Sequence, residues 1–229
     1  MQVAFLTEGA TEHAVPFGGG GAEPWETSFA LQILVERILG IQGRLEACPA
    51  GRRRAGAGPI LKRGLALLCD AVRQGAGAVI LLVDADGRSQ ERLRRLREHR
   101  ERAHSKGARF QVPIVVGVAI ETIEAWLLAD ENALARVLGV RERATHTGAP
   151  EDLRGKKGGS DDPKARLEEW RSRDRHGPRG FLEQMNAIVR EIDLDVVALR
   201  CPKGFAPFCE EVRTHLGPLF GPPSSRGRG

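Results

Sequence analysis

The stretch Ala78-Val-Ile-Leu-Leu-Val-Asp84-Ala-Asp86-Gly87 decides the fold class of this chain. Its opening run is apolar and rich in β-branched side chains, which is typical of a central parallel strand covered on both faces. The two aspartates occupy positions i and i+2, so in an extended segment both carboxylates project to the same side. Open parallel sheets bind ligands at the carboxyl ends of their strands, and the stretch therefore predicts an α/β fold with an acidic site there. The alternative is a turn in which Asp84 caps the next helix and Asp86-Gly87 closes the bend.

Strand-like and helix-like patterns alternate along the N-terminal half of the chain. Short apolar runs predict strands, and apolar residues at helical spacing predict helices. The predicted strands are Val3–Leu6, Arg44–Cys48 and Val112–Val118, and the predicted helices are Glu26–Leu39, Ile60–Val72, a basic helix capped by Ser89, and Glu121–Leu138 as one helix or two. This alternation indicates a mostly parallel central sheet with helices on both faces.

The C-terminal part is expected to be a helical extension. We predict an α/β core over residues 1–139, a flexible loop over 140–162, an extension over 163–217 that packs on the core, and a disordered tail over 218–229. Prolines at a first turn favour helix starts in the extension. Its predicted elements are helices at Pro163–Arg173, Pro178–Ile192 and Phe205–Leu216, with Val196–Leu199 as a candidate last strand.

Composition narrows the classes of protein to consider. The longest apolar runs, Ala76–Val83 and Val112–Ile120, are about half the ~20 residues of a membrane-spanning helix, and the N-terminus has no signal-peptide pattern. The four cysteines form no C-x-x-C pair, which argues against zinc and disulfides and favours the reducing cytoplasm. Aromatic residues make up only 5% of the chain, so base stacking on aromatic side chains is not expected to dominate recognition.

The net charge of +5 is concentrated in one segment. Residues 88–109 contain nine Lys or Arg and three Glu, a surplus of 9 − 3 = +6. Such a segment predicts a polyanionic partner, in particular nucleic acid, with Arg88, Arg92 and Arg95 nearest the aspartates. The alternative is a solvated helix face with Glu–Arg pairs.

Acidic residues also follow two of the other predicted strands. Glu8 comes directly after the first strand and precedes Gly9, and Glu12 would share its helical face if a helix begins at Gly9. Both could instead favour a helix N-terminus electrostatically. Glu121 follows the strand that ends near Val118, and three residues on comes Glu124.

Glu124 falls within an apolar helical stripe, between Leu127 and Leu128 on the helical wheel. A buried carboxylate is costly unless it is paired or binds a metal, so Glu124 is a candidate ligand or one half of a buried pair with an arginine. The three acidic clusters meet only if their strands are neighbours. If they do meet, Mg²⁺ or Mn²⁺ would relieve the repulsion between the carboxylates.

These motifs together resemble the TOPRIM superfamily, which includes topoisomerases, bacterial primases and OLD-type (overcoming lysogenization defect) nucleases. Glu8-Gly9 and Asp84-Ala85-Asp86 match its Glu-Gly and Asp-x-Asp in order and setting. The second acid of OLD-type nucleases would be Glu12. The stretch from Glu121 to Asp130 resembles an uncharacterised bacterial TOPRIM-like family that reads Glu-Ala-Trp-Leu-Leu-Ala-Asp. The resemblance covers about the first 130 residues.

The resemblance implies a TOPRIM-like fold and a metal-dependent nuclease that acts on DNA or RNA. One or two Mg²⁺ or Mn²⁺ ions would be held by Glu8, Glu12, Asp84 and Asp86, completed by Glu121 or Glu124. The OLD-like mechanism also uses a lysine near the metals. Lys203, after the candidate strand 196–199, is the expected residue, and Lys164 is the other candidate.

Two departures from the superfamily limit what the resemblance implies. The chain has no Tyr, which excludes strand passage through a tyrosyl–DNA linkage. It also lacks a Walker A motif, because six residues rather than four separate Gly148 from Gly155-Lys156 and a lysine follows where Ser or Thr should bind Mg²⁺. An ATPase, if used, would be a separate partner, and the resemblance then implies a role in bacterial defence.

Two other functions stay open from the sequence. Asp-x-Asp after a strand also occurs in phosphatases that form an aspartyl-phosphate, with Asp84 as the nucleophile. Alternatively, the chain is a non-catalytic nucleic-acid-binding or regulatory subunit that keeps the acids for a structural ion.

Overall fold

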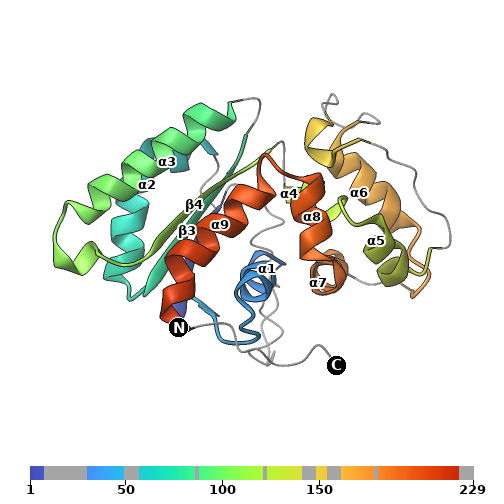
Figure 1. The fold of residues 1–229 in the computed structure, drawn as a ribbon, viewed down its shortest axis with the longest axis horizontal. Coiled ribbons are helices and arrows are strands. Elements are labelled where there is room, and N and C mark those ends of the chain that lie inside the picture. Colours follow the sequence, from blue (N-terminus) through green and yellow to red (C-terminus); the bar gives the residue numbers. More distant parts are fainter. Residues whose placement is uncertain are drawn as a thin grey trace.

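The computed structural model describes residues 1–7, 30–48, 57–85, 88–120, 123–140, 148–153, 161–177 and 180–221. A sheet with its covering helices forms one side of the molecule, and a group of helices lies beside it (Figure 1). The fold is α/β, as the sequence predicts.

Within these residues the sheet has four parallel strands in the order β2-β1-β3-β4. The strands are β1 (Gln2–Thr7), β2 (Glu46–Ala47), β3 (Ala78–Asp84) and β4 (Ile114–Ala119). In β3 every residue before Asp84 is buried, as expected for a central strand with both faces covered. Because all strands run the same way, their carboxyl ends lie at one edge of the sheet.

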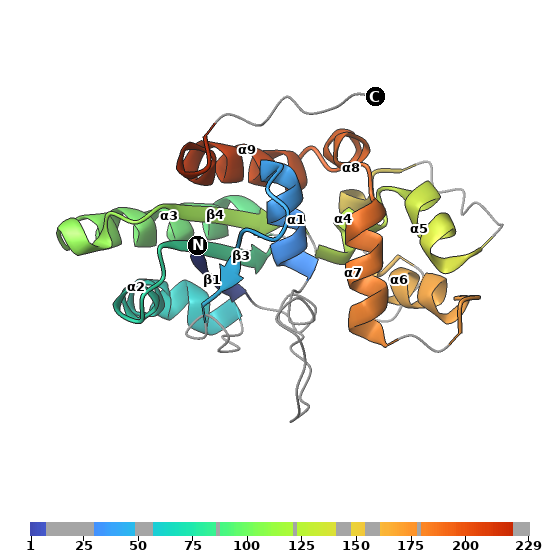
Figure 2. The same ribbon diagram turned by 90° about the horizontal axis from the view of Figure 1, so that it is seen from below.

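Helices cover both faces of the sheet (Figure 2). On one face lie α2 (Ala57–Arg73) and α3 (Ser89–His104), and on the other lie α1 (Ala30–Leu39) and α9 (Phe205–Leu216). Successive side chains of β3 point to opposite faces of the sheet, as strand geometry requires. Leu81 packs in the hydrophobic cluster under α2 and α3, and Leu82 packs in the cluster that contains α1 and α9.

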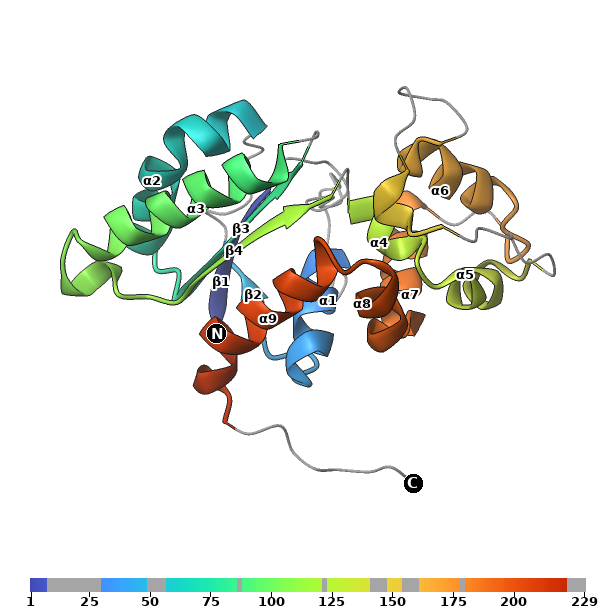
Figure 3. The ribbon, with the colours of Figure 1, turned by 45° about the horizontal axis from the view of Figure 1, so that its top comes forward.

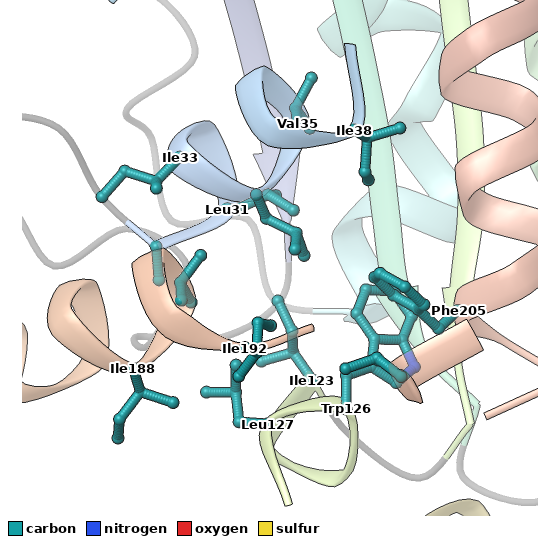
Figure 4. Packing of buried hydrophobic residues seen from close by; sticks show 14 of the residues in the cluster. Leu31, Ile33, Val35, Ile38, Ile123, Trp126, Leu127, Ile188, Ile192 and Phe205 are labelled. Atoms are coloured by element: carbon teal, nitrogen blue, oxygen red, sulfur yellow. The ribbon is translucent and has the colours of Figure 1, made fainter. Parts of the chain in front are cut away.

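The remaining helices form a lobe beside the sheet, joined to it by a continuous hydrophobic core. The lobe consists of α4 (Ile123–Leu127), α5 (Glu131–Leu138), α6 (Pro163–Ser172), α7 (Phe181–Glu191) and α8 (Leu194–Arg200). Figure 4 shows Leu31 of α1 facing Ile123 of α4 and Ile192, the residue that follows α7. Trp126 of α4 packs on Phe205 of α9, with ring centroids 5.3 Å apart. The core thus fixes α4 relative to the sheet.

Short 3-10 helices occur at Ala108–Phe110 (η3), Pro150–Asp152 (η4) and Gly217–Leu219 (η5). Two of them lie at least partly in segments for which the sequence predicts no order: η4 falls within the predicted loop 140–162, and η5 extends from residue 217 into the predicted tail 218–229. Residues 141–147, 154–160 and 222–229 lie outside the described part of the chain.

Two local predictions were wrong. Val196–Leu199, a candidate strand, lies in α8, because Asp193 accepts hydrogen bonds from the backbone N–H groups of Asp195 and Val196 and so starts a helix there. Ser89 does not cap α3: it is the first helical residue, and Arg88 is at the cap position without a side-chain capping bond.

The segment Glu121–Leu138 contains two helices, one of the two arrangements predicted. The second begins at Glu131, directly after Asp130, whose side chain caps it by accepting the Ala133 N–H at 3.0 Å. No helix in the described part of the chain is long and apolar enough to cross a membrane.

Candidate functional site

The three strands that precede the acidic clusters are neighbours in the sheet. β1 and β4 pair with β3 on its two sides, with Thr7 opposite Leu82 and Ala119 opposite Asp84. β1 ends at Thr7, directly before Glu8 in the sequence, and β4 ends two residues before Glu121. The condition for the acidic clusters to meet, neighbouring strands with carboxyl ends at one edge, is therefore satisfied.

Asp84 ends the middle strand of these three. Only 14% of its side chain is exposed. Arg92 of α3 donates a hydrogen bond to the backbone carbonyl of Asp84 and so ties the first turns of α3 to the strand end. The carboxylate is thus held at the sheet edge with little access to bulk water, where its charge acts strongly on neighbouring groups.

A lysine from the helical lobe reaches this carboxylate. The Nζ atom of Lys164 lies 3.9 Å from Oδ2 of Asp84. Lys164 is in the first turn of α6, where Asp162 accepts its backbone N–H at 3.0 Å and buried Pro163 begins the helix. The pair therefore joins the sheet to the lobe across the carboxyl edge.

Glu124 lies in α4, the first helix after β4, and only 6% of it is exposed. This confirms the burial predicted from the helical wheel. The helix α4 packs against α6, so Glu124 is carried by the helix next to the one that carries Lys164. The rest of the motif around it is structural: Trp126 is in the core, and Asp130 caps α5 while accepting the Asp193 N–H at 2.8 Å.

Four predicted site residues, Glu8, Glu12, Asp86 and Glu121, lie outside the described residues. Among the residues that are described, no three His, Cys, Asp or Glu side chains are grouped as a metal site would require. Of the acids predicted at the strand ends, the structure describes Asp84. Its carboxylate oxygens are suitable ligands for a hard cation such as Mg²⁺.

The two candidate lysines differ in their surroundings. The prediction for Lys203 depended on a strand at 196–199, which is a helix instead. The ammonium of Lys203 pairs with Asp152, and its backbone N–H donates to Oε2 of Glu151 at 2.8 Å. It is Lys164 that lies beside Asp84, although sequence spacing favoured Lys203.

The basic helix α3 is partly neutralised by its own glutamates. Arg95 pairs with Glu91 at 2.7 Å and Arg94 pairs with Glu98. Those pairs agree with the alternative of a solvated, internally paired face. Arg88, at the N-terminal end of α3, is exposed. Of the three arginines expected to contact nucleic acid, Arg88 offers the most accessible charge, since Arg92 is bound to the Asp84 carbonyl.

Sequence reasoning missed the buried carboxylate of Glu151. This residue is 1% exposed, and it accepts backbone N–H groups of Lys203, Gly204 and Phe205 at the start of α9. Burial raises the pKa of Glu151, and the backbone hydrogen bonds partly offset that rise. No local signal reveals this role, because its partners are more than 50 residues away.

Comparison with known proteins identifies a family. Residues 27–213 match the model of a family described as a domain of unknown function (DUF4276). Searches of curated proteins and of solved structures found no match. The matched segment includes β2, β3, β4, the lobe and most of α9, and β1 lies outside it.

Proposed function

We propose a metal-dependent nuclease function for this chain, which belongs to the DUF4276 family. The observation that carries the proposal is the order of the strands: β1, β3 and β4 are adjacent, and the sequence places acids at the end of each strand or within two residues after it. An internally paired structural cluster would not need acids at three neighbouring strand ends. The resemblance of Glu8-Gly9 and Asp84-Ala85-Asp86 to TOPRIM motifs supports the same function.

The proposed metal ligands are Asp84 together with Glu8, Glu12, Asp86 and one of Glu121 and Glu124. Bound there, Mg²⁺ or Mn²⁺ would supply an activated water and neutralise charge on the scissile phosphate. The burial of Asp84 at the strand end supports a largely desolvated site. Such surroundings suit a hard divalent cation.

Lys164 is the proposed basic residue of the site. Its ammonium lies beside Asp84 and is half exposed, so it can contact a non-bridging oxygen of a phosphodiester that approaches the carboxyl edge. Arg88, exposed at the start of α3, would hold the nucleic-acid backbone nearby through sequence-independent charge. A separate ATPase partner and a role in defence remain proposals that rest on the resemblance to OLD-type nucleases.

Cleavage assays test this function. Plasmid DNA, oligodeoxynucleotides and RNA are incubated with Mg²⁺, Mn²⁺ or EDTA and with wild-type or Asp84→Asn protein. We expect cleavage that requires metal and that Asp84→Asn lowers by about 100-fold or more, since it removes charge from the centre of the site. Asp152→Asn is the matched control, because Asp152 also pairs with a lysine but is not among the proposed metal ligands.

The lysines give a second comparison. Lys164→Met should lower kcat/KM by about tenfold to 100-fold, whereas Lys203→Met, which removes a lysine of similar exposure, should leave it unchanged. Thermal unfolding of each variant confirms that it is folded. Equal cleavage by wild type and Asp84→Asn would refute the proposal. A covalently phosphorylated Asp84 would indicate the aspartyl-phosphate phosphatase instead.

A further inference from the structure

Helices α3 and α9 flank β4, and their charged side chains meet at the start of that strand (Figure 3). From α3, Nη1 of Arg100 donates to Oε2 of Glu211 in α9 at 2.8 Å and lies 2.9 Å from Nε2 of His215, also in α9. The same Nη1 lies 3.3 Å from the backbone carbonyl oxygen of Ile114 in β4. The side chains of Arg100 and Glu211 are each 16% exposed. One largely shielded guanidinium thus joins α3, α9 and β4.

The Nε2 atom of His215 has two neighbours that require opposite protonation states. Arg100 has only N–H donors, so Nε2 accepts its hydrogen bond only as a bare nitrogen, in a neutral ring with the proton on Nδ1. The Oε2 atom of Glu211 lies 3.3 Å from the same Nε2. A carboxylate is an acceptor, so this second contact becomes a hydrogen bond only when Nε2 carries a proton. Through Nε2, His215 bonds either Arg100 or Glu211, but not both.

We propose that His215 is a proton-operated latch between α3 and α9. The neutral ring accepts a hydrogen bond from Arg100 and so helps to hold the two helices together. The protonated ring donates to Glu211, four residues before it in the same helix, and repels the guanidinium. A hydrogen bond between helices is exchanged for one within α9. The latch lies at the start of β4, whereas the proposed metal site lies beyond its end, and the latch does not depend on that site.

The charged groups around His215 come from two helices. Glu211 belongs to its own helix, and Arg100 and His104 belong to α3. Arg97 of α3 lies 3.9 Å from the Glu211 carboxylate and so acts on the same group. β4 contributes no ionisable side chain. In α1, which also packs on α9, both charged side chains bond backbone groups of other segments.

These surroundings favour the neutral ring. Burial lowers the pKa of His215, Glu211 raises it, and Arg100 and His104 lower it, so that the pKa lies below its ordinary value of 6.5. The folded protein therefore binds this proton less tightly than the unfolded chain does. The stabilisation from the neutral ring is fully present above pH 6.5 and is lost as the pH falls through the lowered pKa. Because α9 covers one face of the sheet, we expect acid to increase local opening of this helix.

NMR titration of the full chain, labelled with ¹⁵N, tests the latch. Wild type should show the Nδ1–H tautomer of His215 above about pH 7, because Arg100 occupies Nε2. Arg100→Met should raise the pKa of His215 and Glu211→Gln should lower it, since they remove a cation and an anion from beside the ring. Arg94→Met, which also removes a paired arginine of α3, and Glu183→Gln, at an exposed acid of α7, are the controls and should leave it unchanged.

Amide hydrogen exchange measures the release of α9. Relative to His215→Gln, which carries no charge at any pH, the protection of α9 amides in wild type should fall by about threefold or more from about pH 7.5 to about pH 5. The comparison separates His215 from other titrating groups. The tautomer of wild type needs no variant, so it decides the case in which a variant fails to fold. The latch is refuted by an Nε2–H tautomer near neutral pH, by an unchanged or lowered pKa of His215 in Arg100→Met, or by equal loss of α9 protection in wild type and His215→Gln.

Discussion

At the scale of single residues, Glu151 is a buried carboxyl group held by the start of a helix. Three backbone N–H groups from residues 203–205 donate to its carboxylate. Its raised pKa means that the folded protein binds a proton there more tightly than the unfolded chain does. Its ionisation therefore works against folding as the pH rises, even though the hydrogen bonds partly compensate.

Glu151→Gln keeps an oxygen acceptor and cannot ionise. The stability of wild type relative to this variant should be greatest below the ordinary carboxyl pKa of 4.5 and should fall as the pH rises through the raised pKa of Glu151. Urea unfolding of both proteins from about pH 4 to about pH 8 measures the difference. Parallel pH profiles for the two proteins would contradict the assignment.

Asp130 is a structural residue within the motif that resembles a TOPRIM-like family. One oxygen caps α5 and the other accepts the Asp193 N–H before α8. Asp130→Ala should lower the free energy of unfolding by about 2 kcal/mol, since it removes a cap and leaves a second N–H unsatisfied. Asp195→Ala, on exposed α8, is the control. A change below about 0.5 kcal/mol would show that water replaces both bonds.

The sequence predicts the surroundings of a single residue correctly where neighbouring residues in the chain determine them. The burial of Glu124 follows from its place on a helical wheel, and the structure confirms it. The choice between Lys164 and Lys203 depends on which helix reaches the sheet edge, and no local pattern contains that information. Glu8, Glu12, Asp86 and Glu121 stay predicted ligands.

At the scale of elements, α9 packs closely on β4 because a glycine, Gly117, occupies the contact point on the strand. An added Cβ at Gly117 would lie 2.6 Å from Cδ2 of Phe208 and 3.0 Å from Cδ1 of Leu82. The absence of a side chain at Gly117 thus lets the aromatic ring of α9 rest on the strand.

Gly117→Ala should destabilise the protein by about 1–3 kcal/mol, because the methyl group forces α9 or Phe208 to move. Phe208→Leu in the same chain should restore part of that loss, so the two substitutions should be less damaging together than their sum. Chemical unfolding of the single and double variants measures the coupling. Strict additivity would show that the methyl group is accommodated elsewhere.

The sequence predicts elements well where apolar periodicity is continuous. The run Ala78–Val83 is a buried strand, and Phe205–Leu216 is a helix with the predicted bounds. Val196–Leu199 failed because its β-branched residues follow a helix-capping aspartate, and the cap outweighs strand propensity. The strand order could not be predicted, because it depends on contacts between distant segments.

At the scale of the whole molecule, the C-terminal helix completes the N-terminal sheet. The buried residues of α9 belong to the same hydrophobic cluster as those of α1 and α7 and as the alternate residues of β3 that face them. Residues 1–139 therefore lack one cover of the sheet, and the predicted core and extension depend on each other for folding.

Truncation tests this dependence. Removal of residues 222–229 should leave the melting temperature within about 2 °C of wild type, because the described core ends before them. Removal of residues 201–229 takes α9 off one face of the sheet and should abolish cooperative unfolding, as followed by circular dichroism. A cooperative transition near the wild-type temperature in the shorter chain would contradict the shared core.

The central claim is that the carboxyl edge of the sheet binds a divalent metal through Asp84. Titration calorimetry of the full chain with Mn²⁺ tests it most directly, because binding does not require a substrate or a partner. The account predicts saturable binding that Asp84→Asn weakens by about tenfold to 100-fold and that Asp152→Asn leaves unchanged. Equal Mn²⁺ affinity in wild type and Asp84→Asn, or no binding to either, would contradict it.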